Sequence, residues 1–185
     1  MKKKICVVGL GYIGLPTAAL LASKGYDVHG VDVVQSTVDI INRGEIHIVE
    51  PELDMFVKSA VSSGKLKADL KPTISDVFII AVPTPFHEGF VPNIDYVITA
   101  TKSISPFIKK GDMVILESTS PVGTTDLVAE ALKNENIDIS TIYISHCPER
   151  VLPGQIMREL VENDRIIGGI TSEATKKTVE FYKTF

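Results

Sequence analysis

Three glycines near the start of the chain constrain its fold more than any other feature. Residues 4–8 read KICVV, and residues 9–14 read GLGYIG, so the glycines follow the spacing G-x-G-x-x-G. A helical pattern covers residues 15–24, and a second apolar run covers residues 26–31. In such a turn the first glycine allows a tight bend, the second lets the backbone approach a pyrophosphate, and the third lets the helix pack closely on the strand. The order of these elements predicts a βαβ unit that binds a dinucleotide.

An acidic residue stands where this kind of unit needs one. Asp32 follows the second apolar run, eighteen residues after Gly14. A carboxylate there accepts hydrogen bonds from the adenosine ribose, and its charge repels a 2′-phosphate. The helix that starts at the third glycine offers N–H groups and the positive end of its dipole to the phosphates. We therefore expect NAD as the cofactor in preference to NADP.

The composition fits a single globular domain and excludes several other classes. The chain has 185 residues, of which 44% are hydrophobic and 23% charged, and its formal net charge is −4. That balance gives no basic surface for nucleic acid or an anionic membrane. The two cysteines, Cys6 and Cys147, lack metal-site spacing, so we expect no metal site. They are expected to be reduced and buried, which favours a cytoplasmic location.

Strand and helix patterns alternate through the rest of the chain. We expect helices over residues 36–42, 51–62, 95–108, 123–134 and 172–185. We expect strands over residues 65–70, 77–82, 113–116, 142–145 and 165–170. Ser36 and Ser172 are the expected helix caps, and Pro106 must end or kink its helix. The alternation predicts an α/β fold, namely a doubly wound parallel sheet of the Rossmann type.

The last helical pattern, which begins at Ser172, contains no glycine stop before Phe185. We therefore expect this helix, over residues 172–185, to be cut short. On this interpretation residues 1–185 form the NAD-binding domain of a longer enzyme, and the central helix and substrate domain are absent from this chain.

Three loops at successive strand ends carry the other chemical groups. They read VPTP at residues 82–85, ESTSPVGTT at 117–125 and HCPERVLPG at 146–154. Ligands of doubly wound sheets bind beyond the carboxyl ends of the strands, so these loops should lie beside the cofactor. Ordinary loop chemistry, with hydroxyls that cap helices, also explains each loop taken singly. Three such loops together favour a site.

These segments resemble the NAD-binding domain of the UDP-glucose/GDP-mannose dehydrogenase family, whose members oxidise the C6 alcohol of a sugar nucleotide to a carboxylate. The resemblance spans essentially the whole chain, through the glycine turn, Asp32, residues 42–44 and 50–53, and the three loops. Residues 148–154 and 159–165 resemble the branch that acts on UDP-N-acetyl-D-mannosamine. UDP-glucose dehydrogenases carry P-E-F-L-x-E in the first stretch, and Pro153 stands here at the second glutamate. The resemblance thus implies a UDP-N-acetylhexosamine substrate and a polysaccharide precursor as product.

The resemblance also implies roles for individual residues. The cofactor would be held by Gly9, Gly11, Tyr12, Ile13, Gly14, Asp32, Thr84 and Thr119. Arg150 and Val151 would contact the sugar nucleotide. Glu149 would assist hydrolysis of a covalent intermediate while Thr119 places the water, and a positioned base of this kind contributes roughly 10²–10⁴-fold. The neighbouring Arg150 would keep Glu149 ionised, although a surface ion pair is the alternative. Thr37 stands where relatives often have a basic residue at the adenosine end.

The family's nucleophilic cysteine and active-site lysine lie beyond residue 185, and neither Cys6 nor Cys147 fits the nucleophile. The chain alone is therefore expected to bind NAD without turning over substrate, and the full-length enzyme to be a homodimer or larger. Two alternatives remain open. One is another branch that oxidises UDP-N-acetylglucosamine, UDP-N-acetylgalactosamine or UDP-glucose. The other is a stand-alone module in which NAD occupancy controls a partner surface.

Overall fold

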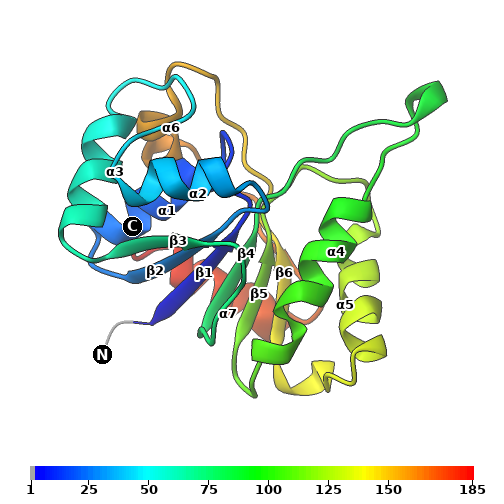
Figure 1. The fold of residues 1–185 in the computed structure, drawn as a ribbon. Helices are drawn as coiled ribbons and strands as arrows, with labels where there is room; N and C mark the ends of the chain where they lie inside the picture. The colour runs from blue at the N-terminus through cyan, green and yellow to red at the C-terminus, as the bar shows by residue number, and fades with distance from the viewer. Residues whose placement is uncertain (1–2) are drawn as a thin grey trace.

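The computed structural model describes residues 3–185, which form one sheet covered by helices on both faces (Figure 1). The strands are β1 (Lys4–Val8), β2 (Asp27–Val31), β3 (Leu66–Asp69), β4 (Val77–Ile80), β5 (Met113–Leu116), β6 (Tyr143–His146) and β7 (Gly168–Gly169). The helices are α1 (Gly14–Ser23), α2 (Gln35–Asn42), α3 (Leu53–Ser62), α4 (Asp95–Ile104), α5 (Thr124–Asn134), α6 (Ile156–Glu162) and α7 (Ser172–Tyr182). Short 3₁₀ turns lie at Glu88–Phe90, Ser105–Phe107 and Ile139–Thr141.

The strand order confirms the expected doubly wound sheet. The order is β3-β2-β1-β4-β5-β6-β7, and all neighbours are parallel except β6 and β7. The chain therefore winds outward in both directions from β1 and β4, and their carboxyl ends form the switch point where such sheets bind ligands. The short antiparallel β7, which pairs Gly169 with Ser145, is the one departure from the expected parallel arrangement.

The alternation of side chains along the strands divides the core into two clusters. Ile5 and Val7 of β1 face a cluster shared with α1, α2, α3, α6 and α7, whereas Cys6 and Val8 face a cluster shared with α4 and α5. Every residue of β4 and β5 is buried, as the continuous apolar runs predict. Within residues 3–185, no helix has both the length and the apolar character to cross a membrane.

Neither serine expected to cap a helix does so. Helix α2 begins at Gln35, so Ser36 lies inside its first turn. Helix α7 is capped by Thr171, whose hydroxyl accepts a hydrogen bond from the Ala174 N–H at 3.1 Å. A capping oxygen has to stand on the residue just before the first helical one, a position that neither serine occupies.

The carboxyl-terminal part of the chain differs most from the expected pattern. The strand expected over residues 165–170 is reduced to β7, and Arg165, at the start of that stretch, pairs with the buried carboxylate of Glu149. Helix α6 was not expected. Helix α7 ends at Tyr182 instead of running to Phe185, and the Thr184 N–H closes its last turn on the Phe181 carbonyl at 3.0 Å. Helix α4 ends at Ile104, short of the expected residue 108, and Pro106 lies in the 3₁₀ turn that follows, which fits its expected effect on the helix.

Candidate cofactor and active site

The glycine turn after β1 fits tightly against β4. Gly9 has a φ of +93°, and a Cβ on it would lie 2.5 Å from the carbonyl oxygen of Ala81. A Cβ on Gly14 would lie 1.7 Å from the carbonyl oxygen of Gly9. Any side chain at either position would therefore force the turn, the start of α1 and the end of β4 apart. The first and third glycines thus play the structural roles expected of them.

The second glycine borders open space. Apart from Gly11 and its two chain neighbours, no described residue has an atom within 4 Å of a Cβ placed on Gly11. This space lies at the amino-terminal end of α1, whose first turn, residues 14–17, contains no charged side chain. Backbone N–H groups and the helix dipole favour an anion there. The turn therefore fits the pyrophosphate of a dinucleotide. Tyr12 is half exposed beside it, and Ile13 is partly buried.

Asp32 ties the end of β2 to the glycine turn. Its Oδ2 accepts a hydrogen bond from the Leu10 N–H at 3.1 Å, and its Oδ1 accepts one from the Val34 N–H at 3.0 Å. The carboxylate is partly exposed and has further lone pairs, so it can also accept bonds from ribose hydroxyls. Thr37 is buried in α2.

The three loops expected to meet do come together. The Thr84 hydroxyl donates to the Thr119 carbonyl at 2.7 Å, and the Ser118 hydroxyl donates to the Val82 carbonyl at 2.7 Å. A ring nitrogen of His146 lies 3.2 Å from the Ser118 carbonyl. These bonds join the segments after β4, β5 and β6 into one edge next to the glycine turn.

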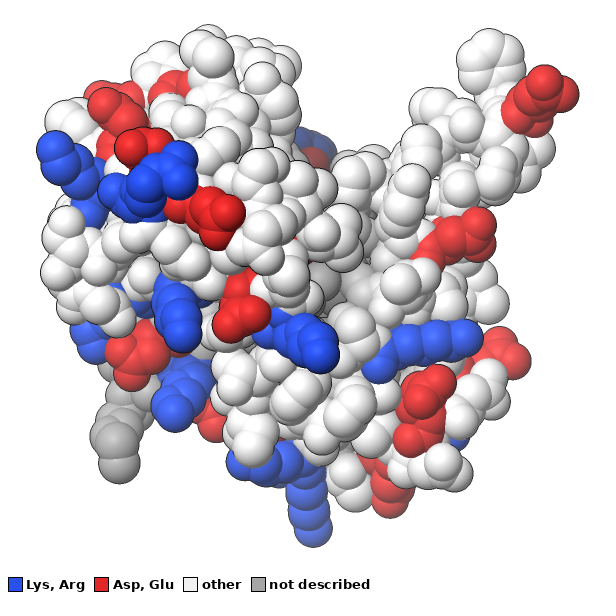
Figure 2. Space-filling view, in the orientation of Figure 1, with Lys and Arg blue, Asp and Glu red and all other residues white. Residues whose placement is uncertain are grey.

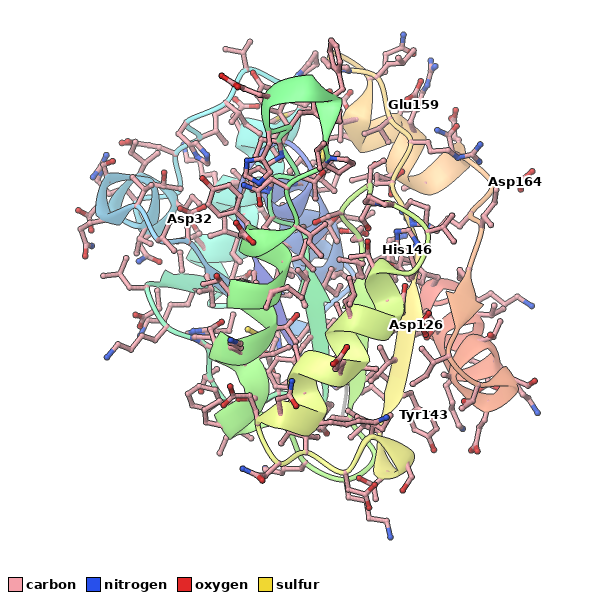
Figure 3. The ribbon with its side chains drawn as sticks, turned by 90° about the vertical axis from the view of Figure 1, so that its right-hand side faces the viewer. Asp32, Asp126, Tyr143, His146, Glu159 and Asp164 are labelled. Carbon is pink, nitrogen blue, oxygen red and sulfur yellow. The ribbon has the colours of Figure 1, made fainter. Side chains whose placement is uncertain are left out.

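The surface at this edge is hollowed. Figure 2 shows a hollow between the projecting segment at residues 83–93 and the body that carries α1, α2 and α3, and its walls are mostly uncharged. In Figure 3, Asp32 lies toward one end of this edge, whereas His146 and Asp164 lie toward the other. Asp32, which follows β2, and His146, which ends β6, therefore lie well apart along this edge.

Glu149 is buried just beyond β6, but its charged partner is not the one expected. Its Oε2 accepts a hydrogen bond from Nη1 of Arg165 at 2.5 Å, and its Oε1 accepts one from the backbone N–H of Arg150 at 2.9 Å. The Arg150 guanidinium donates instead to the carbonyl of Asp164 at 3.0 Å. The side chains of Arg165 and Glu149 are 13% and 4% exposed, so the pair is not a surface ion pair either.

A second carboxylate, which was not predicted from the sequence, lies behind Glu149. The side chain of Glu117 is fully buried after β5, and its oxygens accept hydrogen bonds from the hydroxyls of Thr17 and Tyr182, both at 3.2 Å. Burial raises the pKa of Glu117 to about 7. The available signal was a charged residue placed directly after a continuous apolar strand, whereas only the hydroxyls of that loop were assigned a role.

Neither cysteine is suited to nucleophilic chemistry. Both thiols are free and buried, and burial raises the pKa of Cys6 to about 12 and that of Cys147 to about 11. Because the thiolate is the nucleophile, these thiols stay inert at neutral pH. Among residues 3–185, no three potential metal-binding side chains come together. His29 lies 2.9 Å from the Lys71 carbonyl, which is a structural contact.

The segment after Glu149 is held by acidic side chains. Glu50 is buried, and its two oxygens accept hydrogen bonds from the N–H groups of Gly154 and Ile156, both at 2.7 Å. The Glu50 carboxylate thereby caps α6 from a distant part of the chain. Val151 packs partly against the hydrophobic cluster that includes Ile156. The segment that carries Arg150 and Val151 is therefore fixed on its far side.

The strand order, the glycine turn and the acid at the end of β2 define a Rossmann-type domain that binds a dinucleotide. Residues 3–185 match the model of the UDP-glucose/GDP-mannose dehydrogenase family, NAD binding domain. The chain belongs to this family, and its cofactor is NAD.

The chain is similar to several nucleotide-sugar dehydrogenases. It is 56% identical to the UDP-N-acetyl-D-mannosamine dehydrogenase of Campylobacter jejuni, with 98% of this chain and 47% of that protein covered. It is 51% identical to the NDP-N-acetyl-D-galactosaminuronic acid dehydrogenase of Ralstonia nicotianae, with 99% and 45% covered. The solved UDP-N-acetyl-mannosamine dehydrogenase Cap5O of Staphylococcus aureus superposes with a TM-score of 0.93 at 48% identity, with 98% and 45% covered. The chain thus spans about half the length of the relatives it matches.

Proposed function

We propose that the protein is the NAD-binding part of a dehydrogenase that oxidises the C6 alcohol of UDP-N-acetyl-D-mannosamine to the carboxylate, a precursor for polysaccharide. The observation that carries this proposal is the buried Glu149, which follows β6 at the sheet edge shared with Thr84 and Thr119. The likeness to enzymes named for this substrate supports it.

The residues of the glycine turn have a binding role in this proposal. Bound NAD supplies the acceptor for the electron pairs. Gly9, Gly11 and Gly14 let the backbone approach the pyrophosphate, with Tyr12 and Ile13 in the same turn, while Asp32 binds the ribose. Thr84 and Thr119, joined by their own hydrogen bond, line the nicotinamide side.

The overall reaction converts one primary alcohol, two NAD⁺ and one water into one carboxylate, two NADH and three protons. We assign the proton transfer from that water to Glu149. Two of its lone pairs are used by Arg165 and Arg150, and a carboxylate has about four, so it can still accept the proton. Thr119, which is exposed at the same edge, would help to place the water.

Several parts of the proposal concern the longer protein. The nucleophilic cysteine and a lysine would come from residues beyond this domain, so the 185-residue chain should bind NAD without turnover. We further propose a homodimer or larger assembly and a cytoplasmic location, where the free thiols of Cys6 and Cys147 would remain reduced. The similarity to the Ralstonia protein makes an N-acetylgalactosamine epimer the main competing substrate. Arg150 and Val151 would contact whichever sugar nucleotide binds.

NADH formation by the full-length protein across a panel of UDP-sugars tests this function. Two NADH per UDP-N-acetyl-D-mannosamine, with little signal from UDP-glucose, is the expected result. Preference for another UDP-sugar would keep the reaction and replace the substrate. With the right sugar, Glu149→Gln should accumulate acyl-enzyme, which intact mass detects, whereas the exposed control Glu162→Gln should turn over normally.

A further inference from the structure

Arg165 lies between two carboxylates that come from different strand ends. Its Nη1 donates to Glu149 after β6 and lies 3.9 Å from Oε1 of Glu117 after β5. One guanidinium thus serves both acids, and its side chain is only 13% exposed. The ion pair to Glu149 is therefore largely shielded from water, which strengthens it relative to a surface pair.

Arg165 is itself held from two further sides. Its Nη2 donates to the carbonyl of Leu160 in α6 at 2.9 Å. Its guanidinium carbon lies 4.6 Å from the centre of the Tyr182 ring in α7. A planar cation over an aromatic ring has a defined plane, and the bond to Leu160 fixes its rotation within that plane. These contacts leave Nη1 directed at Glu149.

Glu117 is held in the same way. The hydroxyls of Thr17 and Tyr182 occupy one oxygen each, so the carboxylate stays behind Arg165. Charges buried in this manner seldom stabilise a fold more than apolar side chains of similar size would. These side chains meet around Glu149, which is itself buried. Their contribution is therefore the orientation of the Glu149 carboxylate, and not added stability of the fold.

We propose that Arg165 is the positioning residue of Glu149, and that Glu117 and Tyr182 hold Arg165 in the orientation this requires. The proposal rests on the role proposed above for Glu149. A general base must meet its water at hydrogen-bond distance, and a displacement of about 1 Å can cost on the order of 10²-fold in rate. The geometry of the guanidinium fork, and not its charge alone, then matters for hydrolysis.

The variant Arg165→Lys separates geometry from charge in the full-length protein. Lysine keeps the cation, so the buried acids stay compensated, but it cannot bond Leu160 and Glu149 in one plane. We expect kcat to fall roughly 10- to 100-fold with KM little changed, and the acyl-enzyme to accumulate after the NADH burst. The exposed Arg158→Lys on α6 is the matched control. The proposal would be overturned if Arg165→Lys hydrolysed the acyl-enzyme at the wild-type rate. It would also be overturned if the NADH burst slowed as much as the hydrolysis.

The pKa of Glu117 gives a readout that needs no turnover. The charge of Glu149 raises this pKa and that of Arg165 lowers it. In the 185-residue chain, carboxyl ¹³C shifts should therefore show a lower Glu117 pKa in Glu149→Gln and an unchanged one in Glu162→Gln. If Glu149→Gln lowers the Glu117 pKa but the full-length protein oxidises no UDP-sugar, the proposed function fails. The contact of Arg165 with both carboxylates would still be supported. If sugars are oxidised but Glu149→Gln leaves the Glu117 pKa unchanged, the positioning proposal alone fails.

Discussion

Glu50 and Ile156 are joined by a hydrogen bond of 2.7 Å although 106 positions separate them in the chain. The other oxygen of the same carboxylate binds the Gly154 N–H. The first N–H groups of a helix lack partners within it, and here a remote side chain supplies one. Helix α6 and the segment before it therefore depend on the loop that precedes α3.

Removal of this remote cap should destabilise the fold. Glu50→Ala leaves the buried N–H of Ile156 and the partly buried N–H of Gly154 without this acceptor, so the free energy of unfolding should fall by about 1–3 kcal/mol. Urea unfolding followed by circular dichroism measures the change. The exposed neighbour Glu52→Gln serves as control and should shift the midpoint little. Equal stability of the two variants would contradict the capping role.

The glycines of the turn should respond differently to the same substitution. Gly11→Ala adds a Cβ that, apart from its chain neighbours, meets no atom of the described residues within 4 Å, so the free energy of unfolding should change by less than about 1 kcal/mol. Its NAD affinity should drop roughly ten-fold or more, because the methyl occupies the pyrophosphate space. Gly14→Ala should lower the stability itself by about 3 kcal/mol or more. Thermal unfolding measures the effect on stability, and calorimetric titration with NAD measures the effect on binding. Unchanged NAD affinity in Gly11→Ala would show that the pyrophosphate does not bind next to Gly11.

The carboxylate at the end of β2 should set the choice of cofactor. Asp32→Ala removes the expected ribose acceptor and its negative charge, so NAD affinity should fall roughly ten-fold and the gap to NADP should narrow. Asp32→Asn keeps an acceptor for the Leu10 N–H and controls for distortion of the turn. Dissociation constants for both cofactors give the ratio. An unaltered ratio in Asp32→Ala would show that selectivity lies elsewhere.

Stability should fall as pH rises from about 4.5 to about 7, in part because of Glu117. Its pKa is raised from an ordinary value of 4.5 to about 7, so in this window the unfolded chain releases a proton that the folded chain retains. The contribution of Glu117 to the free energy of unfolding is fully present below pH 4.5. It falls by about 3 kcal/mol as the pH rises to about 7. Thr17, Tyr182, Arg165 and Glu149 face the carboxyl, and the Cys147 thiol is also coupled to it.

Glu117→Gln provides the comparison for this pH effect. The amide keeps partners for the two hydroxyls but does not titrate. The stability difference between the variant and the native chain, from urea unfolding at a series of pH values, should therefore change across the window. Other acids with a raised pKa, such as Asp112, cancel in that difference. Parallel curves would mean that Glu117 does not bind its proton more tightly when folded.

The amino-terminal half of the fold follows from local sequence, and this explains why it could be predicted. The glycine turn, β1, α1 and β2 carry their own signals in periodicity and glycine spacing. Helix α6 carries no such signal, because its capping acid is Glu50, and a single sequence does not reveal a contact between positions so far apart. The expected strand at residues 165–170 also includes a residue with a distant partner, because Arg165 pairs with Glu149 sixteen positions away.

The site divides along similar lines. Thr84 and Thr119 were both expected to line the nicotinamide side, and their loops follow strands whose carboxyl ends share one edge. The Thr84 hydroxyl donates to the Thr119 carbonyl, so the two loops do meet at that edge, while the role toward nicotinamide stays a prediction. The prediction that Arg150 is the charged partner of Glu149 was wrong, because neighbouring positions in the sequence do not place two charged groups side by side. Glu149 and Arg150 are consecutive, yet their charged groups bond in different directions, to Arg165 and to the Asp164 carbonyl.

Because Cys6 and Cys147 are buried, this domain should not react with thiol reagents. With their pKa values raised to about 12 and about 11, neither thiol offers thiolate to iodoacetamide at neutral pH. Alkylation of the full-length protein would then report only on sulfur outside residues 3–185. If the proposed function is right, the labelled peptide would identify the nucleophilic cysteine of the longer protein by mass, with no background from residues 3–185.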